Sequence, residues 1–511
     1  MKKNLTKYFL LSITALLLSA CSGGGSSNNT TPVNNYSLSL EMTRLTTATP
    51  NPFQVTATLK NNGTPEANQN LQLTIPNGNT SAVTDLGNGQ YRFTVTPSTY
   101  GLHPVTISFS NATITRTALV LNGYATGVGQ PQLIPGDAVN TEGYEDGITI
   151  TPDGQYLFIQ YGPLYFTGLF SIGTICSSGG YTVGYDLNTC DGRTNSSLVF
   201  NTVGPYNNSI RPNFPTTGIN ANGTFKHLPS VQTNGLANGI IGFPTVFYGF
   251  KKQTDGTFAE PFKVAFNDER GLNGPFGLTF KPNANGTTDF AVAWNNYFND
   301  LGDDKADVYT GTLTLGQNKN LGDVVYNNEM YVSITPNITP VNFSSHANTQ
   351  GNPYLELDNS GNVKAIWTDD EASSKNLSVY RLTAGTYPTG TWTLDTLPAV
   401  INTAGEESQP TMIGNRLYMN RDLKIVYHEY RPTNGSCSSG YTHADCWGPE
   451  VVLLQGSGST TVGQIFGVGE PTVAFVDGKK YLYFVFVRAR TNNLVTGLPD
   501  FNLDAAFVEI P

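Results

Sequence analysis

Acidic residues recur at the start of apolar segments in the second half of the chain, and they could do acid–base chemistry. Asp146 precedes GITITPDGQYLFIQY, Glu407 begins ESQPTMIGNRLYMNR, and Glu470 lies in GEPTVAFVDGKKYLYFVFVRA. Cleavage of a glycosidic bond needs two carboxyl groups on opposite sides of a sugar. Asp146, Glu407 and Glu470 are therefore the candidate catalytic residues, provided that the fold brings them together.

A second set of residues, at the ends of apolar segments, combines aromatic and polar side chains. Sugar hydroxyls pair with polar groups, and the apolar faces of sugars stack on aromatic rings. Packing between sheets is the alternative role for the tryptophans, and hydrogen bonding to backbone N–H groups is the alternative role for the acids. The predicted ligand-binding residues are Trp294, Asn295, Trp367, Asp369, Arg421 and Arg488.

These residues belong to a segment that recurs along the chain: a polar turn, an apolar strand, a Gly or Asn turn, and a second apolar strand. The copies begin at Glu145, Asn273, Gly351, Glu407 and Gly469. Intervals that hold four strands each are typical of β-propeller blades. Residues 123–511 are therefore predicted to form a five-bladed β-propeller, whose last blade is completed by a strand from GVGQPQLIPG, just ahead of the first blade.

Residues 163–243 separate the second and third strands of the first predicted blade. They are rich in Gly, Asn, Pro and Tyr and contain Cys176 and Cys190. A segment this long is either a functional insertion or evidence against the assignment. An insertion at about 163–243 is the favoured prediction, and a sixth blade is the alternative.

Apart from Cys21, the cysteines form two local pairs, Cys176 with Cys190 and Cys437 with Cys446. Short spacing and an even number favour disulfides in an exported chain. Neither pair has the two-residue spacing of a zinc knuckle. We expect two disulfides and no metal site, although other pairings stay open.

The propeller repeats are preceded by a segment of alternating strands, residues 36–122, which includes PFQVTATLKNNG and HPVTISFSN. Strands of this length with Gly and Asn turns predict a β-sandwich. The segment resembles the immunoglobulin-like modules of invasin and intimin type adhesins, which act as stalks or spacers. The predicted fold is thus all-β, with an N-terminal immunoglobulin-like β-sandwich before the propeller.

The start of the chain has the composition of an export signal. Lys2, Lys3 and Lys7 precede an apolar stretch that ends in Leu-Ser-Ala-Cys at Cys21. The stretch is shorter than the roughly 20 residues of a membrane-spanning helix, and basic, apolar and small residues in this order predict a cleaved signal. The site resembles the bacterial lipobox, which implies cleavage after residue 20, lipidation of Cys21 (palmitate included) and a flexible tether over residues 21–35.

The resemblance to exported lipoproteins also implies a location. Ser22 follows the cysteine, where Asp would retain such a protein at the inner membrane. The expected location is the bacterial cell envelope, at the outer membrane, on either its periplasmic or its surface face.

The propeller repeats resemble two families. ITITPDGQYLFIQY is similar to the repeats of TolB-type propellers, which bind proteins, and EDGITI is similar to glycoside hydrolases of the arabinanase and invertase kind. The second resemblance implies that Asp146 is the first of three catalytic carboxylates. Asn273 and Asn352 stand where the other two would be, and an amide does not exchange a proton at neutral pH.

Composition excludes some partners. The net charge is −10, charged residues make up 13% of the chain, and no Lys/Arg cluster is present; nucleic acid is therefore not an expected partner. No cofactor motif is visible. The favoured interpretation is an envelope or surface lipoprotein that binds a glycan or a protein through its propeller mouth, for example in adhesion. A glycoside hydrolase and a structural component of an envelope assembly are the alternatives.

Overall fold

The computed structural model of this 511-residue chain is built from β-strands. The helical element of the described residues is a single 3-10 turn, Ala444–Cys446 (η3). Within those residues no helix is long and apolar enough to cross a membrane. The structure describes residues 34–45, 50–141, 144–162, 246–266, 272–273, 279–283, 286–297, 307–315, 324–326, 329–336, 340–343, 350–370, 376–432, 437, 440–492 and 499–511.

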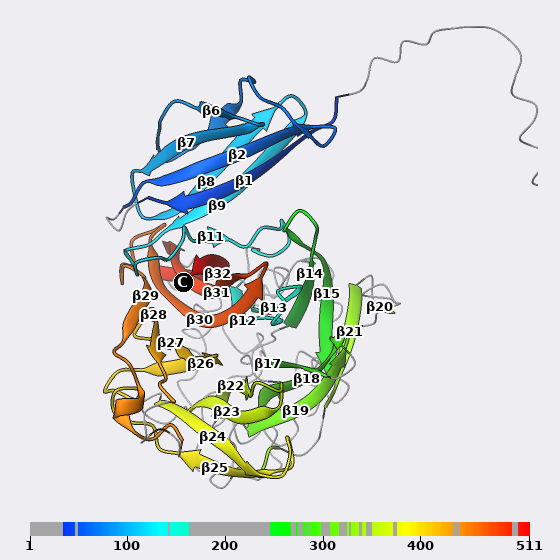
Figure 1. Ribbon diagram of the computed structural model, residues 1–511, viewed down its shortest axis with the longest axis vertical. Coiled ribbons are helices and arrows are strands. Elements are labelled where there is room, and N and C mark those ends of the chain that lie inside the picture. Colours follow the sequence, from blue (N-terminus) through cyan, green and yellow to red (C-terminus); the bar gives the residue numbers. More distant parts are fainter. Residues whose placement is uncertain are drawn as a thin grey trace, which may run out of the picture.

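The N-terminal part is a two-layer β-sandwich (Figure 1). Side chains alternate between buried and partly exposed along β2 and β8, as expected where one face of each sheet packs on a core. Phe53 and Val55 of β2 meet Val105 and Ile107 of β8 in that core. One layer contains β1 (Tyr36–Arg44), β2 (Phe53–Asn61), β3 (Thr64–Pro65), β5 (Gly78–Thr80), β6 (Thr84–Gly87) and β7 (Gln90–Pro97); the other contains β4 (Gln72–Thr74), β8 (Gly101–Phe109) and β9 (Ala112–Val120).

The remainder is a β-propeller, in which groups of strands, antiparallel within each group, follow one another around a centre (Figure 1). The first two groups form one ten-stranded sheet, because residues 263–266 pair in parallel with residues 331–334. The first groups are β12 (Tyr144–Ile150), β13 (Tyr156–Gly162), β14 (Val246–Lys252) and β15 (Phe258–Phe266), then β16 (Leu272–Asn273), β17 (Thr279–Asn283), β18 (Gly286–Tyr297), β19 (Asp307–Thr314), β20 (Val324–Tyr326) and β21 (Glu329–Pro336). The next are β22 (Gln350–Leu357), β23 (Val363–Asp370), β24 (Asn376–Ala384) and β25 (Thr391–Asp395), then β26 (Glu407–Ile413), β27 (Arg416–Arg421), β28 (Lys424–Glu429) and β29 (Val451–Gln455). The last is β30 (Ile465–Val476), β31 (Lys479–Asn492) and β32 (Pro499–Ile510).

The ring is closed by β11 (Gln132–Leu133), which pairs with β32 of the last group. The N–H groups of Gly129 and Ile134 donate to the carbonyls of Glu509 and Ala505 at 2.9 and 3.2 Å. The prediction that GVGQPQLIPG completes the last sheet is therefore confirmed. This pairing satisfies backbone groups of β32 that an open edge would leave unpaired.

The same short strand ties the propeller to the sandwich. Gln132 of β11 pairs with Ala118 of β9, so the last propeller group and one layer of the sandwich form a single seven-stranded sheet. Upstream of it, β10 (Gly123–Tyr124) pairs with β29. The guanidinium of Arg44 also donates to the carbonyls of Ala125 and Val128 at 2.8 and 2.9 Å. The connection between the two parts is thus hydrogen-bonded into both of them.

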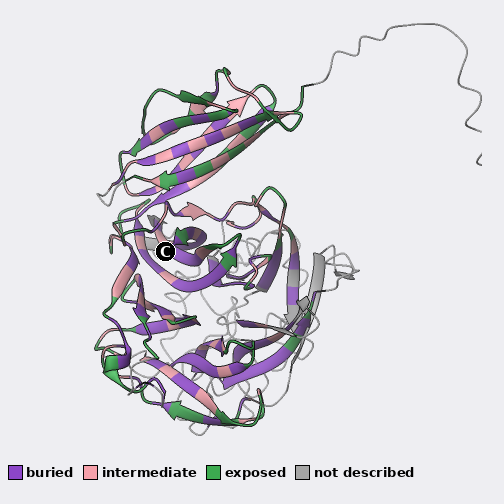
Figure 2. Cartoon of the chain, viewed as in Figure 1, coloured by how far each residue is buried: buried purple, intermediate pink, exposed green. Residues whose placement is uncertain are grey.

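Hydrophobic clusters fill the spaces between neighbouring strand groups. Figure 2 shows that buried residues predominate along many of the propeller strands. Ile150 and Phe250 of the first group pack with Ala474 and Val485 of the last, so the ring is closed by its core as well as by its hydrogen bonds. Burial of such side chains stabilises each by roughly 1.5–3 kcal/mol. This core fixes the positions of the innermost strands.

The predicted disulfide between Cys437 and Cys446 is confirmed, with a Cα–Cα distance of 5.5 Å. It packs beside Tyr441 and Trp447 in a buried cluster. Cys176, Cys190 and the predicted insertion lie outside the described residues, as do the predicted signal peptide and Cys21.

Candidate functional site

Four of the innermost strands share a β-bulge at corresponding places. The pairing register shifts between Asp146 and Thr149 in β12, and at the matching positions of β22, β26 and β30. A bulge bends the strand and re-aims its side chains. The residues at the bulges have positive φ angles: Gly147 (57°), Asn352 (43°), Gln409 (55°) and Glu470 (55°). Pro353, Pro410 and Pro471 follow the last three directly, which explains the recurring proline.

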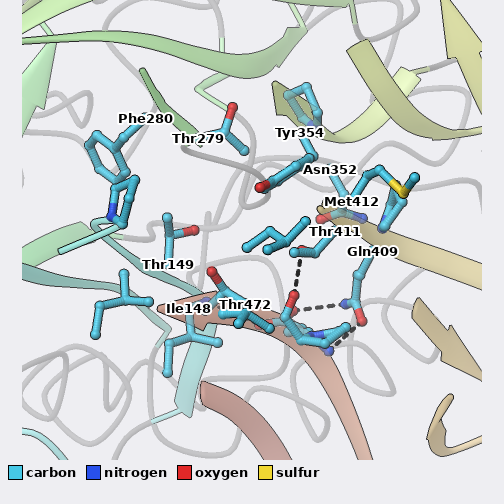
Figure 3. Close-up of a pocket in the computed structure, with 18 of the residues that line it drawn as sticks. Ile148, Thr149, Thr279, Phe280, Asn352, Tyr354, Gln409, Thr411, Met412 and Thr472 are labelled. Atoms are coloured by element: carbon cyan, nitrogen blue, oxygen red, sulfur yellow. Dashed lines mark hydrogen bonds between the residues drawn. The ribbon is translucent and has the colours of Figure 1, made fainter. Parts of the chain in front are cut away.

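The innermost strands surround a central cavity of about 230 Å³ (Figure 3). A hydroxyl-bearing residue lies two positions after each bulge, and Thr279 of β17 lies on the same wall. Apolar side chains such as Ile148, Phe280 and Met412 form much of the remaining surface. The hydroxyl-bearing residues of the wall are Thr149, Thr279, Tyr354, Thr411 and Thr472.

Several of these hydroxyls have no partner within the described residues. Thr411 Oγ1 donates to the carbonyl of Pro471 at 2.6 Å and so joins β26 to β30. In contrast, Thr279 Oγ1 is buried and makes no hydrogen bond in the described part of the chain, and the Thr149 and Thr472 hydroxyls make none there either. Buried polar groups of native proteins are nearly always hydrogen-bonded. A molecule bound in the cavity would give partners to the Thr149 and Thr472 hydroxyls, whereas Thr279 Oγ1 has almost no accessible surface.

The cavity wall carries almost no charge. Among the described residues that line it, Glu470 alone has an acidic or basic side chain. Burial, and then the neighbouring Asp146 carboxyl group, raise the pKa of Glu470 well above its usual range. Glu470 is therefore protonated and neutral over a wider pH range than an exposed glutamate. A neutral wall favours a neutral ligand, because an ion would lose its hydration without gaining a counter-charge.

Polar side chains at the bulges link neighbouring strand groups. Gln409 Nε2 donates to Glu470 Oε1 at 2.9 Å, and the Glu470 N–H donates to Gln409 Oε1 at 2.8 Å. On the other side, the Ile148 N–H donates to Glu470 Oε2 at 3.2 Å. Asp369 accepts hydrogen bonds from the Gln409 N–H at 3.2 Å and from the Asn352 side chain. We call this chain of contacts the inter-strand belt; it connects β22, β26, β30 and β12 around the cavity.

The structure brings two of the three candidate catalytic residues together. Asp146 and Glu470 are hydrogen-bonded to each other, and both are 8% exposed. Glu407 is fully buried, forms an ion pair with Arg421 at 3.1 Å, and accepts a hydrogen bond from Thr403 at 2.5 Å. It does not line the central cavity. The three acids therefore do not converge on one substrate position.

Neither candidate tryptophan reaches the cavity. Trp294 is 1% exposed and packs against Phe158 and Phe262, between the first and second strand groups. Trp367 is fully buried in the cluster that contains Met419, between the third and fourth groups, and its Nε1 donates to Glu356 Oε2 at 2.8 Å. The two rings therefore face opposite neighbours in their respective groups. Packing between sheets, the alternative role, is what the structure shows for both.

The other predicted binding residues also lie away from the cavity wall. Asn295 and Asp369 are each 1% exposed, and Arg421 is 7% exposed. Arg421 is held by Glu407 and Glu450, while Arg488 forms an ion pair with Asp504 at 2.9 Å. Asp369 takes part in the inter-strand belt instead of facing a ligand. Asp369, Arg421 and Arg488 are therefore held by contacts within the fold, whereas the buried amide of Asn295 has no hydrogen-bond partner within the described residues.

Sequence reasoning missed the threonines of the cavity wall. Three of them stand two residues after a bulge, in Gly147-Ile-Thr, Gln409-Pro-Thr and Glu470-Pro-Thr. This three-residue pattern was the available signal. The pattern is hard to recognise in the sequence, because threonine is a common residue of strands and is neither charged nor aromatic.

No protein-family model matches the sequence, and no curated protein matches it. Similar solved structures include an α-L-arabinofuranosidase from Lactobacillus brevis, with 9% identity, a TM-score of 0.35, and coverage of 73% of this chain and 92% of that chain. An α-L-arabinanase from Cellvibrio cellulosa has 12% identity, a TM-score of 0.28, and coverage of 50% and 88%. A neuraminidase-like protein from a flat-faced bat influenza virus has 8% identity, a TM-score of 0.30, and coverage of 74% and 90%. Likenesses this distant carry no argument about activity or ligand.

Proposed function

We propose that this chain is a non-catalytic binding protein that takes a neutral sugar into the central cavity of its propeller. The proposal rests on two hydroxyls of the cavity wall that have no partner in the described part of the chain, those of Thr149 and Thr472. Hydroxyls donate and accept at once, which matches the hydroxyls of a sugar. The apolar surface beside them matches its C–H faces.

The size of the cavity limits the part of a glycan that enters. Its volume of about 230 Å³ is below the roughly 300–1,000 Å³ of typical small-ligand sites. A single sugar ring at the end of a chain is therefore the proposed occupant. The remainder of the glycan would extend from the propeller mouth.

A glycoside hydrolase is the second candidate, and one observation favours it. Glu470 has a raised pKa and lies beside Asp146, as a general acid beside a carboxylate would. Against it, both oxygens of Glu470 accept hydrogen bonds from Gln409 and Ile148. A proton donor to a leaving group would have to give up such contacts, so binding without turnover is the preferred function.

The proposal places the protein in a bacterial envelope. The disulfide between Cys437 and Cys446 is typical of exported proteins, in agreement with a signal peptide over residues 1–20. Lipidation of Cys21 would anchor the chain, at the outer membrane by the identity of Ser22. We further propose five blades and an immunoglobulin-like sandwich acting as a spacer; one innermost strand per blade, β12, β17, β22, β26 and β30, supports the blade number.

A glycan array, followed by product analysis, tests the proposed function. The full chain, solubilised in detergent, is screened on the array, and each bound glycan is then incubated with the protein and examined by mass spectrometry. Binding of neutral glycans that stay intact is the expected result. Shortened glycans would support the hydrolase instead, and Glu470→Gln should then abolish cleavage.

An array without any binding would overturn the sugar proposal. Binding of a protein partner, or a structural role in an envelope assembly, would then be the favoured function. Capture of partners from envelope extracts would distinguish these two functions.

A further inference from the structure

A second and larger cavity, of about 710 Å³, lies between the sandwich and the propeller; we call it the interdomain cleft. Its walls are the end of β1, the linker before β11, the β14–β15 turn and the β30–β31 turn, in the region where the sandwich meets the propeller in Figure 1. Sites for small ligands occur preferentially between domains and have volumes of roughly 300–1,000 Å³. The size and place of the cleft thus meet the usual conditions for a binding site.

The walls of the interdomain cleft are held in place without a ligand. β11 pairs with both β9 and β32, so the two walls belong to one continuous sheet. The linker is fixed by Arg44, which donates to two of its carbonyls and lies 4.7 Å from the centre of the Tyr124 ring. A preformed site loses less conformational entropy on binding than one that must assemble.

Aromatic side chains line the propeller side of the cleft. Tyr481 and Tyr483 lie on the same face of β31 because side chains alternate along a strand. Phe507 of β32 stacks on Tyr483 with 5.9 Å between ring centres and 25° between planes, and it lies 6.2 Å from Tyr481. Tyr481 and Phe507 are only partly buried. Such a platform can stack against the C–H face of a sugar.

Two basic side chains of the cleft have no ion pair within the described residues: Arg116 of β9 and Lys252 of β14. Arg116 makes one hydrogen bond there, to the carbonyl of its neighbour Thr115 at 3.1 Å. Burial lowers the pKa of Arg116, and the carboxylates of Asp255 and Asp137 act in the opposite direction without forming an ion pair. Most of the fork of N–H donors on Arg116 is thus available to a ligand.

Acidic side chains lie at both ends of the cleft. Asp255 Oδ1 accepts two hydrogen bonds from Thr257, at 2.9 and 2.6 Å. Lys479 pairs with Glu509 at 2.8 Å. The remaining acids, Glu41 and Asp477, act on the pKa of Tyr481 and therefore lie near the β30–β31 turn. Arg116 and Lys252 thus share their end of the cleft with the Asp255 carboxylate, while the end beside Asp477 is acidic.

From this arrangement we infer that the interdomain cleft is a separate binding site for an acidic oligosaccharide. A guanidinium fork matches a carboxylate through two parallel hydrogen bonds. The carboxylate of a uronic acid would bind Arg116, with Lys252 adding a second positive charge, and the sugar ring would stack on Tyr481 and Phe507. This site does not depend on the central cavity, since the two share no lining residue among the described residues.

Calorimetric titration of the full chain with matched trisaccharides tests this inference. The probes are trigalacturonic acid and triglucuronic acid, each beside the neutral trisaccharide of the same linkage. We expect at least one acid to bind about tenfold more tightly than its neutral counterpart, with the difference decreasing as salt is raised. Arg116→Gln should remove the difference, whereas Arg92→Gln, at an exposed position of β7, should retain it.

Tyr481→Ala should weaken the binding of the acid and its neutral counterpart alike, because both present the same ring face. Absence of binding by both acids would overturn the inference, as would equal affinities for the Arg116→Gln and Arg92→Gln variants. Loss of acid binding in Thr472→Val, with no change in Arg116→Gln, would place the acid in the central cavity and would also overturn it. If the central cavity does not bind neutral sugars, these tests of the interdomain cleft keep the same meaning, because the two sites are separate.

Discussion

Gln409 and Glu470 form a reciprocal pair at corresponding bulges of neighbouring innermost strands. Gln409 Nε2 donates to Glu470 Oε1 at 2.9 Å, and the Glu470 N–H donates to Gln409 Oε1 at 2.8 Å. Both residues have a φ angle of 55°, a conformation that is uncommon outside glycine. The pair joins β26 to β30 at the rim of the central cavity, so the same residues that shape the site also hold the ring together.

Replacing Gln409 with leucine should therefore destabilise the fold. Gln409→Leu removes both hydrogen bonds and leaves a buried N–H and a buried carboxyl oxygen without these partners, each at a cost of roughly 1–3 kcal/mol. We expect the free energy of unfolding, measured in guanidinium chloride, to fall by about 2–4 kcal/mol. Gln155→Leu, at an exposed turn, is the control and should change it by less than about 0.5 kcal/mol. An equally small effect of Gln409→Leu would show that the belt does not stabilise the ring.

The Asp146–Glu470 pair should make stability depend on pH. The pKa of Glu470 is raised in the folded state, so the folded chain holds a proton that the unfolded chain releases above its ordinary pKa of 4.5. The contribution of this group to stability is full below that pH and decreases as pH rises toward the raised pKa. Asp146→Asn removes one cause of the shift, and the free energy of unfolding should then fall less steeply between about pH 5 and pH 8.

The control for this pH series is Asp477→Asn, because Asp477 is exposed and lies outside the pair. Its pH profile should match that of the original protein. Identical profiles for Asp146→Asn and the original protein would contradict the contribution of Asp146 to the raised pKa of Glu470.

Arg421 should contribute much more to stability than Arg416. Arg421 is buried between Glu407 and Glu450, and Glu407 is itself fully buried. Arg421→Met would leave a buried carboxylate without its counter-charge, which costs about 3–5 kcal/mol. Arg416 pairs at 3.4 Å with Glu429, whose side chain is 49% exposed, so Arg416→Met should cost at most about 1 kcal/mol. Equal losses, measured by denaturant unfolding, would be incompatible with this difference in burial.

Trp367 should support the fold without contacting the ligand. Trp367→Phe keeps an aromatic ring in the cluster but removes the hydrogen bond to Glu356, so the free energy of unfolding should fall by about 1–3 kcal/mol. Affinity for a sugar bound in the central cavity should stay within about twofold, a change of less than 0.5 kcal/mol. A tenfold loss of affinity in Trp367→Phe at unchanged stability would instead show that the Trp367 ring contacts the ligand.

The alternation of apolar residues and the repeated turns predicted the all-β class, the sandwich and the propeller, and they located the strand that closes the ring. They did not predict the faces of Trp294 and Trp367, because a shift of one residue in a strand reverses the face of every side chain. The bulges at Gln409 and Glu470 were not predicted either. A bulge depends on pairing with the neighbouring strand, so the sequence showed acids near strand starts but not that Glu470 bonds to adjacent strands.

In the proposed function, threonine hydroxyls of the central cavity, including that of Thr472, bind a neutral sugar. Calorimetric titration of a neutral glycan that binds the full chain, compared between Thr472→Val and Thr383→Val, tests it most directly. Both substitutions remove a hydroxyl, but Thr472 lines the central cavity whereas Thr383 is exposed on β24. We expect at least a tenfold loss of affinity for Thr472→Val and none for Thr383→Val. Equal affinities for the two variants would show that the glycan binds elsewhere and would contradict the account.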